Sequence, residues 1–299
     1  GTNDSNLKLI EQHLGVSIFT KGNELSIAES SAEIQQKFKF IIDRLSDEIS
    51  ENGLENSISG SELIESVLNT GVENFDAQKF SISIPGSTRK IYPKTKNQAK
   101  LIQSFRKNDM VFATGPAGSG KTFLAVAESL RLLLSHKISS IILVRPIVEA
   151  GESLGFLPGD MQDKINPYLR PLYDSMSACI PSEMVKKFQE NGIIEVAPLA
   201  YMRGRTLNNA AVILDEAQNT TCEQMKMFLT RTGENSKVFI TGDVTQIDLP
   251  KRISSGLVQA LEILKNIEEI SMVELDGEDV VRSPLVKKIV QAYENDKSE

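Results

Sequence analysis

The sequence has no apolar run long enough to cross a membrane. Its longest uninterrupted apolar stretches, such as Ile141–Val144 and Ala210–Leu214, have the length of β-strands, whereas a membrane-spanning helix needs about 20 apolar residues. No apolar segment of the kind found in secretory signals stands near the start. These absences argue against a membrane protein, and we expect a cytoplasmic location with no membrane partner.

Cysteine and histidine are scarce, with two of each in 299 residues. Cys179 and Cys222 are too far apart for the ligand spacing of a zinc site, and two cysteines do not make a disulfide framework. His13 and His136 are too few for a histidine-based metal centre or a catalytic triad. Metal and nucleophilic chemistry that depends on these residue types is therefore not expected.

Charge is unevenly distributed along the chain. The formal net charge is −7, and residues 1–80 carry an acidic excess, whereas residues 81–107 contain Lys and Arg but no Asp or Glu. The basic stretch is either a solvated linker with a helix face or a local surface that attracts phosphate groups. Hydrophobic residues make up 40% of the chain, which is typical of globular proteins, so a sizeable core is expected.

Residues 1–85 are predicted to form a small α+β domain. Helical and strand patterns alternate here with turn residues such as Lys21-Gly22-Asn23. Ser30 and Glu33 have the spacing of a capping box at the start of a long helix. The predicted elements are a helix at Asn6–Leu14, a hairpin of Val16–Phe19 and Glu24–Ile27, the long helix after Ser30, a short helix at Ser61–Leu68 and a strand at Phe80–Ile84.

Residues 86–299 show a different pattern, in which continuous apolar strands alternate with helices. This pattern predicts an α/β domain with a parallel sheet that is covered by helices on both faces. The predicted strands are Met110–Thr114, Ile138–Val144, Ile193–Val196, Ala210–Leu214, Lys237–Thr241 and Ile270–Leu275. The predicted helices are Thr122–Leu134, Lys164–Ser177, Cys222–Arg231 and Ser255–Ile267.

A phosphate-binding loop follows the first of these strands. The segment fits G-x-x-x-x-G-K-[ST] and stands between a predicted strand and a predicted helix, which is the context that this motif requires. Its backbone N–H groups and the helix N-terminus would cradle the phosphates of ATP. Lys121 would reach the β- and γ-phosphates, and the Thr122 hydroxyl would bind Mg²⁺. The loop consists of Gly115, Pro116, Ala117, Gly118, Ser119, Gly120, Lys121 and Thr122.

Two adjacent carboxylates end the predicted strand Ala210–Leu214. A buried parallel strand would deliver Asp215 to the same sheet edge as the phosphate loop. We assign Asp215 to Mg²⁺ and Glu216 to the orientation or deprotonation of the attacking water. Gln246 follows another strand, and a glutamine there can hydrogen-bond the γ-phosphate, although the segment is also compatible with an ordinary turn.

These motifs together resemble the ATPase motifs of the PhoH family, the phosphate-starvation-inducible PhoH-like proteins. The resemblance implies the P-loop NTPase fold of RecA and the superfamily 1 helicases for residues 86–299, and a KH-like fold for residues 1–85. It also implies that Gln98 contacts the adenine side of the nucleotide and that Gln246 senses the γ-phosphate. The segments that carry it are Gly115–Thr122, Val144–Gly159, Tyr201–Thr206, Leu214–Asn219, Thr241–Pro250 and Asp279–Val286.

We therefore expect an enzyme that hydrolyses ATP with Mg²⁺ and couples the reaction to RNA binding, unwinding or remodelling. A nucleotide-dependent switch with little turnover and a small-molecule kinase are the alternatives. Glu216 favours hydrolysis over a switch, because a switch needs no residue that activates water. A kinase would need an acceptor-binding segment, and the sequence contains no recognisable one.

RNA contact and oligomerisation complete the expectations. Arg203 and Arg205 are the leading candidates for contacts to RNA and residues 81–107 are the second, although the two arginines could equally form structural ion pairs. The length leaves room for one motor domain, so we expect a homo-oligomer, with a closed ring as the favoured form, in which Arg282 reaches the ATP of a neighbouring subunit. The alternative is that Arg282 pairs with Glu278 or Asp279.

Overall fold

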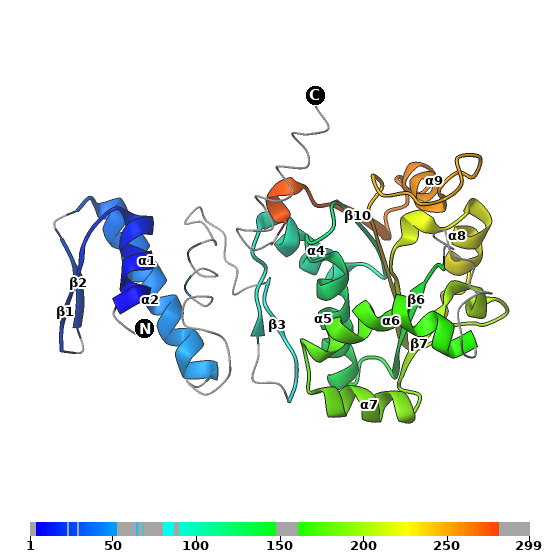
Figure 1. The fold of residues 1–299 in the computed structure, drawn as a ribbon, viewed down its shortest axis with the longest axis horizontal. Coiled ribbons are helices and arrows are strands. Elements are labelled where there is room, and N and C mark those ends of the chain that lie inside the picture. The colour runs from blue at the N-terminus through cyan, green and yellow to red at the C-terminus, as the bar shows by residue number, and fades with distance from the viewer. Residues whose placement is uncertain are drawn as a thin grey trace. The chain divides into compact units, whose positions relative to one another are not determined.

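The computed structural model describes residues 4–22, 24–28, 30–52, 64, 68, 80–86, 90–147 and 161–280. The chain forms two compact units, Gly1–Lys79 and Phe80–Glu299 (Figure 1). The second unit begins before the predicted boundary at residue 86, because β3 (Ile82–Ser83) pairs antiparallel with β4 (Lys90–Ile91). No helix in these ranges is long and apolar enough to cross a bilayer.

In its described ranges, the first unit has two helices with both ends defined and an antiparallel hairpin. Gly15 ends the first helix with a left-handed φ of 69°, and its N–H bonds Glu11 O at 2.8 Å, as a glycine C-terminal stop does. Ile10, Ile18 and Ile41 are buried in its small core. The elements are α1 (Ser5–Leu14), β1 (Ile18–Lys21), β2 (Glu24–Ile27) and α2 (Ala32–Asn52).

The predicted capping box at the start of the long helix is wrong. Ser30 Oγ has no hydrogen-bond partner among the described residues, whereas Ser31 Oγ accepts a bond from Ile34 N at 3.4 Å. Glu33 reaches forward to Lys37 at 2.8 Å, as an i,i+4 ion pair on the helix surface, and so does not turn back to the cap. The predicted helix Ser61–Leu68 lies outside the described residues except for Ile64 and Leu68.

The second unit is built on a six-stranded sheet in the order β10-β5-β9-β8-β6-β7, and every pair of neighbouring strands is parallel. The predicted α/β fold with a parallel sheet is therefore confirmed. Each strand differs from its predicted range by no more than two residues at either end. The strands are β5 (Met110–Thr114), β6 (Ser140–Arg145), β7 (Ile194–Pro198), β8 (Ala210–Leu214), β9 (Lys237–Gly242) and β10 (Ile270–Glu274).

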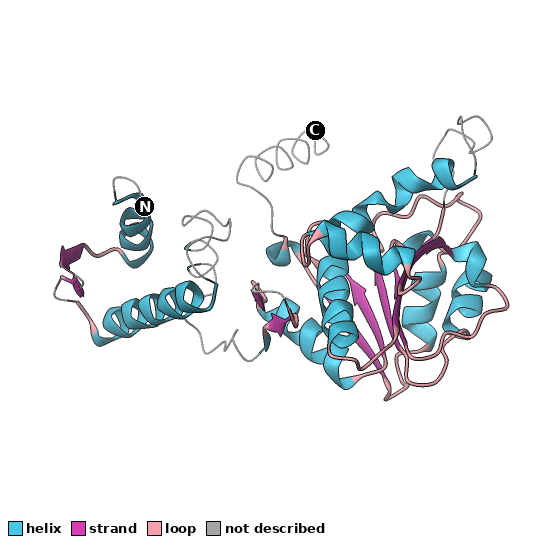
Figure 2. Cartoon of the chain, turned by 90° about the horizontal axis from the view of Figure 1, so that it is seen from below, coloured by secondary structure: helices cyan, strands magenta, loops and turns pink. Residues whose placement is uncertain are grey.

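Helices cover both faces of this sheet (Figure 2). Four of them, α4 (Lys96–Lys107), α5 (Lys121–Leu134), α6 (Met161–Ser177) and α7 (Ser182–Glu190), pack on one face. The helices α8 (Cys222–Leu229) and α9 (Gly256–Ile263) pack on the other. The sequence did not predict α7. Short 3₁₀ turns lie at Leu199–Met202, Ala217–Asn219 and Gly277–Asp279.

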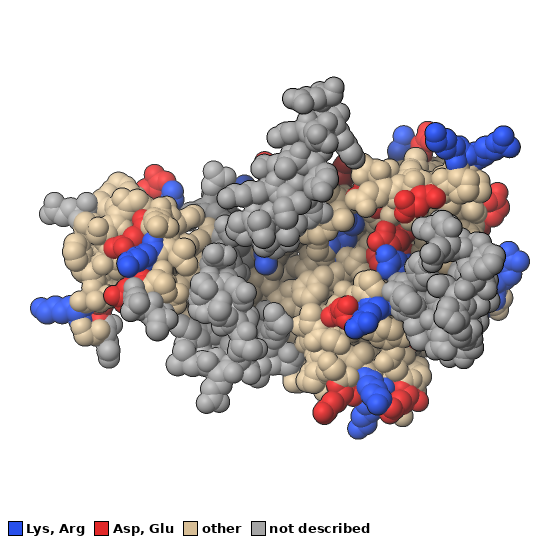
Figure 3. Space-filling view, in the orientation of Figure 1, with Lys and Arg blue, Asp and Glu red and all other residues tan. Residues whose placement is uncertain are grey.

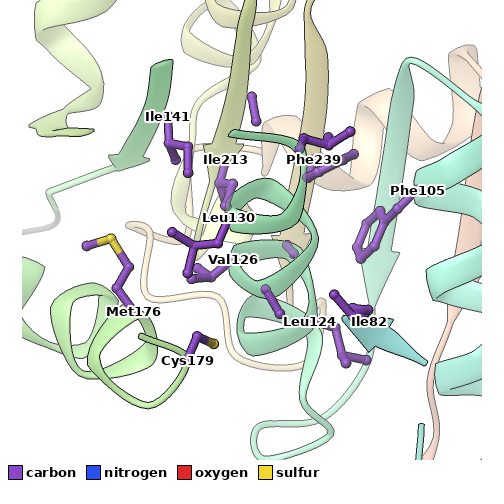
Figure 4. Close-up of a cluster of buried hydrophobic side chains, with 14 of the residues drawn as sticks. Ile82, Phe105, Leu124, Val126, Leu130, Ile141, Met176, Cys179, Ile213 and Phe239 are labelled. Carbon is purple, nitrogen blue, oxygen red and sulfur yellow. The ribbon is translucent and has the colours of Figure 1, made fainter. Parts of the chain in front are cut away.

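The core explains why the strands are apolar along their whole length. Alternate strand residues point to opposite faces, so Ile213 and Phe239 pack under α5 (Figure 4), while Val212 and Ile240 pack under α8 and α9. The ring of Phe105 on α4 packs against the ring of Phe239, with 4.4 Å between the ring centroids and a tilt of 42°. Burial of each such side chain contributes about 1.5–3 kcal/mol. The two-sided core fixes the sheet edge where the predicted site residues meet.

Candidate nucleotide-binding site

The phosphate-binding loop connects β5 to α5, as the motif predicts. Gly115, Gly118 and Gly120 have φ values of 139°, 84° and 86°, a region that residues with a Cβ rarely adopt. A Cβ on Gly115 would also fall 2.2 Å from the backbone oxygen of Leu275, which follows β10. Glycine is therefore required at position 115 by conformation and by packing.

Lys121 turns back onto the loop. Its Nζ donates to the carbonyl oxygens of Gly115 at 2.7 Å and Pro116 at 2.8 Å, and lies 3.3 Å from Ser119 Oγ. Burial lowers the pKa of the Lys121 ammonium. The carboxylates of Asp243, Asp215 and Glu216 oppose that shift, and Asp243 has the largest opposing effect. A phosphate entering the loop would offer this ammonium oxygen acceptors that carry full charge, which bind more strongly than carbonyls.

Thr122 and Asp215, the two residues predicted to bind Mg²⁺, are hydrogen-bonded to each other. Thr122 Oγ1 donates to Asp215 Oδ1 at 2.6 Å, and Thr241 Oγ1 donates to the same oxygen at 2.8 Å. Asp215 is 7% exposed. Within the described residues no three Asp, Glu, His or Cys side chains gather into a metal cluster. The hydroxyl and the carboxylate fit Mg²⁺, which is usually held by one or two carboxylates together with substrate phosphates.

Glu216 follows Asp215 in a left-handed conformation, with φ 52°. Its two carboxylate oxygens accept from different donors: Oε1 from the guanidinium of Arg145 at 2.9 Å, and Oε2 from the Gln218 amide at 2.6 Å. Arg145 Nε also lies 3.9 Å from Asp215 Oδ2. One arginine thus lies close to both of the adjacent carboxylates and forms its short ion pair with Glu216.

Gln246 stands where β9 leaves the sheet. Its Nε2 donates to Asp243 Oδ2 at 2.9 Å, and Asp243 Oδ1 accepts from the backbone N–H and the hydroxyl of Thr245. Asp243 N in turn donates to Gln218 Oε1 at 3.0 Å. This turn therefore joins the predicted γ-phosphate sensor to the residues around Glu216.

These groups surround one cavity of about 230 Å³. The sequence placed the phosphate loop, both carboxylates and the glutamine at one sheet edge, and the structure brings them together there. The sequence analysis did not identify Arg145, Thr241, Gln218 or Asp243. Arg145, Thr241 and Asp243 end or directly follow strands on the same edge, which was the available signal. The cavity is lined by Ala117, Gly118, Gly120, Lys121, Thr122, Phe123, Asp215, Glu216, Gly242, Asp243 and Gln246.

Gln98 lies beside the phosphate loop, on the first turn of α4. Its Nε2 donates to Ser119 O at 2.9 Å, and its Oε1 accepts from Lys94 N at 2.7 Å. The side chain is buried. Both ends of the amide therefore bind protein groups and hold the loop against α4. The contact with adenine stays a prediction.

Arg203 and Arg205, the predicted RNA contacts, do not line this cavity. Arg205 forms a bidentate ion pair with Glu195, at 2.6 and 2.7 Å, which is the structural alternative considered for it. Arg203 is exposed. Arg282 lies outside the described residues. Asp279, one of its two candidate surface partners, is buried and accepts hydrogen bonds from Thr95, Asn97 and Asp276.

Comparisons with known proteins agree with these motifs. The family model described as PhoH-like protein matches residues 90–294. The PhoH-like protein of Bacillus subtilis (strain 168) is 48% identical over 98% of this chain and 92% of its own length. The PhoH-like protein of Synechocystis sp. (strain ATCC 27184 / PCC 6803 / Kazusa) is 43% identical over 98% of this chain and 90% of its own length. Protein PhoH of Escherichia coli (strain K12) is 46% identical over 66% of this chain and 57% of its own length.

The comparison with solved structures found a large terminase and a helicase among its matches. The large terminase of a thermophilic bacteriophage has a TM-score of 0.42 at 12% identity, over 66% of this chain and 49% of the terminase. The Pif1 helicase of Candida albicans has a TM-score of 0.36 at 13% identity, over 67% of this chain and 43% of the helicase. The chain spans less than half the length of either protein.

Proposed function

This chain belongs to the PhoH-like protein family, and we propose that it is an ATPase that hydrolyses ATP with Mg²⁺. The observation that carries the proposal is the hydrogen-bonded group of Thr122, Asp215 and Thr241 beside the phosphate loop. The Thr122 hydroxyl and the Asp215 carboxylate would hold Mg²⁺, which would supply positive charge beside the phosphates. ATP would bring the remaining oxygen ligands of the metal.

The residues around the cavity would share the work of hydrolysis. The backbone N–H groups of the loop and the N-terminus of α5 would hold the phosphates. Lys121 would exchange its loop carbonyls for phosphate oxygens, and Mg²⁺ would neutralise charge that develops in the transition state. Glu216 would orient or deprotonate the water, and Gln246 would contact the γ-phosphate.

Phosphate release with and without Mg²⁺ tests this proposal. Wild-type protein should release phosphate from ATP only with Mg²⁺, and Lys121→Ala should release none. Lys137→Ala, which removes an exposed lysine beyond the far end of α5, is the matched control and should keep the wild-type rate. Equal rates for wild type and Lys121→Ala would refute the assignment.

We extend the proposal to RNA, with α4 as the surface that attracts it. Lys94, Lys96, Lys100 and Lys107 are exposed on or just before this helix, which has no acidic residue. On the face shown in Figure 3, basic and acidic side chains are interspersed over much of the visible described surface, which favours a local contact over a general coat. Arg203 stays a second candidate, and Arg205 is committed to Glu195.

A charge-matched pair of double variants tests the RNA contact. Lys100→Ala with Lys107→Ala should weaken binding to single-stranded RNA and reduce its salt dependence, because each lost phosphate contact lowers the slope against salt. Lys186→Ala with Lys187→Ala removes two exposed lysines from α7 and should leave RNA binding unchanged. Equal weakening by both pairs would indicate an effect of net charge alone.

A further inference from the structure

Arg145 stands at the end of β6, directly beside the strand that carries the two site carboxylates. Val144 pairs with Leu214 in the parallel sheet, and Asp215 N donates to Val144 O at 2.8 Å. Because Val144 and Leu214 are paired, the next residues of the two segments, Arg145 and Asp215, also lie side by side. The Arg145 side chain is 19% exposed, and its guanidinium lies 2.9 Å from Glu216 Oε1.

Gln218 holds the opposite side of the same carboxylate. It is 1% exposed, its Nε2 donates to Glu216 Oε2 at 2.6 Å, and its Oε1 accepts from Asp243 N at 3.0 Å. The bond from Asp243 N, just after β9, fixes the orientation of the Gln218 amide. Its NH₂ group therefore points at Glu216. Glu216 receives one donor from the end of β6 and one from the 3₁₀ turn after β8.

Glu216 needs such support more than its neighbour does. The Glu216 side chain is 39% exposed, whereas the Asp215 side chain is 9% exposed. Glu216 caps the 3₁₀ turn that follows it, so its backbone is held while its carboxylate faces solvent. Without Arg145 the carboxylate would keep only the Gln218 amide as a side-chain donor and would be held less firmly. Misplacement of a reacting group by about 1 Å can cost about 100-fold in rate. A planar guanidinium restricts the orientation of the carboxylate better than an ammonium does.

We propose that Arg145 is a positioning residue that, together with Gln218, holds the Glu216 carboxylate in place for the attacking water. The inference rests on the proposed ATPase function and on the role of Glu216 within it. Arg145 acts through Glu216 and does not itself contact the reacting atoms. This predicts an effect on turnover that exceeds its effect on nucleotide binding and that disappears when Glu216 cannot act.

The experiment is a double-mutant cycle with Arg145→Ala, Glu216→Gln and the combined variant. Arg145→Ala should lower kcat about 10–100-fold and leave the affinity for a fluorescent ATP analogue within about threefold. In the Glu216→Gln background, Arg145→Ala should cause little further loss, because interacting residues are not additive. Guanidinium at millimolar concentration should restore part of the activity of Arg145→Ala but not of the combined variant.

The controls separate positioning from a loss of fold. Lys237→Ala breaks the ion pair between Lys237 and Asp109 at the opposite end of the sheet. The Lys237 side chain is 20% exposed, much like that of Arg145, and this variant should keep the wild-type kcat. Arg145→Lys keeps the charge and should have a kcat between those of wild type and Arg145→Ala; if Arg145→Ala does not fold, this variant carries the cycle. Unchanged kcat, raised kcat or fully additive losses would overturn the proposal. An inactive wild type, or a Glu216→Gln variant as fast as wild type, would instead overturn the proposed function.

Discussion

Thr122 and Asp215 are 93 residues apart in the sequence, yet the Thr122 hydroxyl donates a 2.6 Å hydrogen bond to Asp215 Oδ1. One residue lies at the start of α5 and the other follows β8. Their contact arises because β5, β9 and β8 are consecutive parallel strands, whose carboxyl ends meet at one sheet edge. In the same place, Thr241 at the end of β9 supplies a second donor to the carboxylate.

Thr241→Val should weaken the action of Mg²⁺. Thr241 is fully buried, and valine replaces its hydroxyl by a methyl group of similar size, so Asp215 would lose one of its two hydroxyl donors. Loss of such a partner typically costs about 10–100-fold in metal affinity or activity. Titration of phosphate release with Mg²⁺ should show a shift of the midpoint to higher concentration. An unchanged midpoint would show that Thr241 does not orient Asp215.

Gly115→Ala should destabilise the protein by roughly 2–5 kcal/mol, because it combines a disfavoured φ with overpacking. The new Cβ would meet Leu275 O, a backbone atom, at 2.2 Å. Gly277→Ala is the control, since nothing lies within 4 Å of its Cβ, and its effect should stay within about 0.5 kcal/mol. Urea unfolding compares the two, and equal midpoints would contradict the packing argument.

Gln98→Ala should weaken the binding of ATP and GTP to a similar extent. In the structure the amide joins Ser119 O to Lys94 N, so its loss loosens the loop that holds the phosphates of either nucleotide. Gln103→Ala, on the same helix, is the control. A selective loss of ATP binding would instead support the adenine contact that the family resemblance implies.

We predict that the active unit is a homo-oligomer, with a closed ring as the favoured form, in which Arg282 acts on the ATP of a neighbouring subunit. An arginine supplied in this way can contribute about 10³–10⁵ in rate. Arg282→Ala and Lys121→Ala should each be inactive alone, and mixed assemblies should recover activity because some sites combine intact partners. A fully active monomer in solution would rule the idea out.

The sequence predicted the sheet well, because its buried strands are apolar on both faces and end at strong signals. Gly115 directly follows β5 and Asp215 directly follows β8. Each residue both marks the end of a strand and belongs to the candidate site. The long helix of the first unit was predicted with the wrong cap. Ser30 and Ser31 are chemically equivalent, and only the three-dimensional path of the chain decides which hydroxyl meets a free N–H.

The supporting residues of the site were harder to predict. Arg145 is an ordinary strand-end arginine until the register of β6 against β8 places it next to Glu216. Gln98 was identified through family resemblance, but its bonds to the loop depend on the packing of α4. Such long-range contacts have no periodic signature in the sequence, unlike the phosphate loop, whose geometry is encoded within eight consecutive residues.

The division of labour between Asp215 and Glu216 is the centre of the account, and a comparison of binding with turnover tests it. Glu216→Gln should bind ATP and Mg²⁺ as wild type does and hydrolyse ATP at least about 100-fold more slowly, whereas Asp215→Ala should lose the response to Mg²⁺. The measurement is phosphate release as a function of Mg²⁺ concentration, with nucleotide affinity determined in parallel. Identical nucleotide binding and identical rates for the two variants would contradict the assignment.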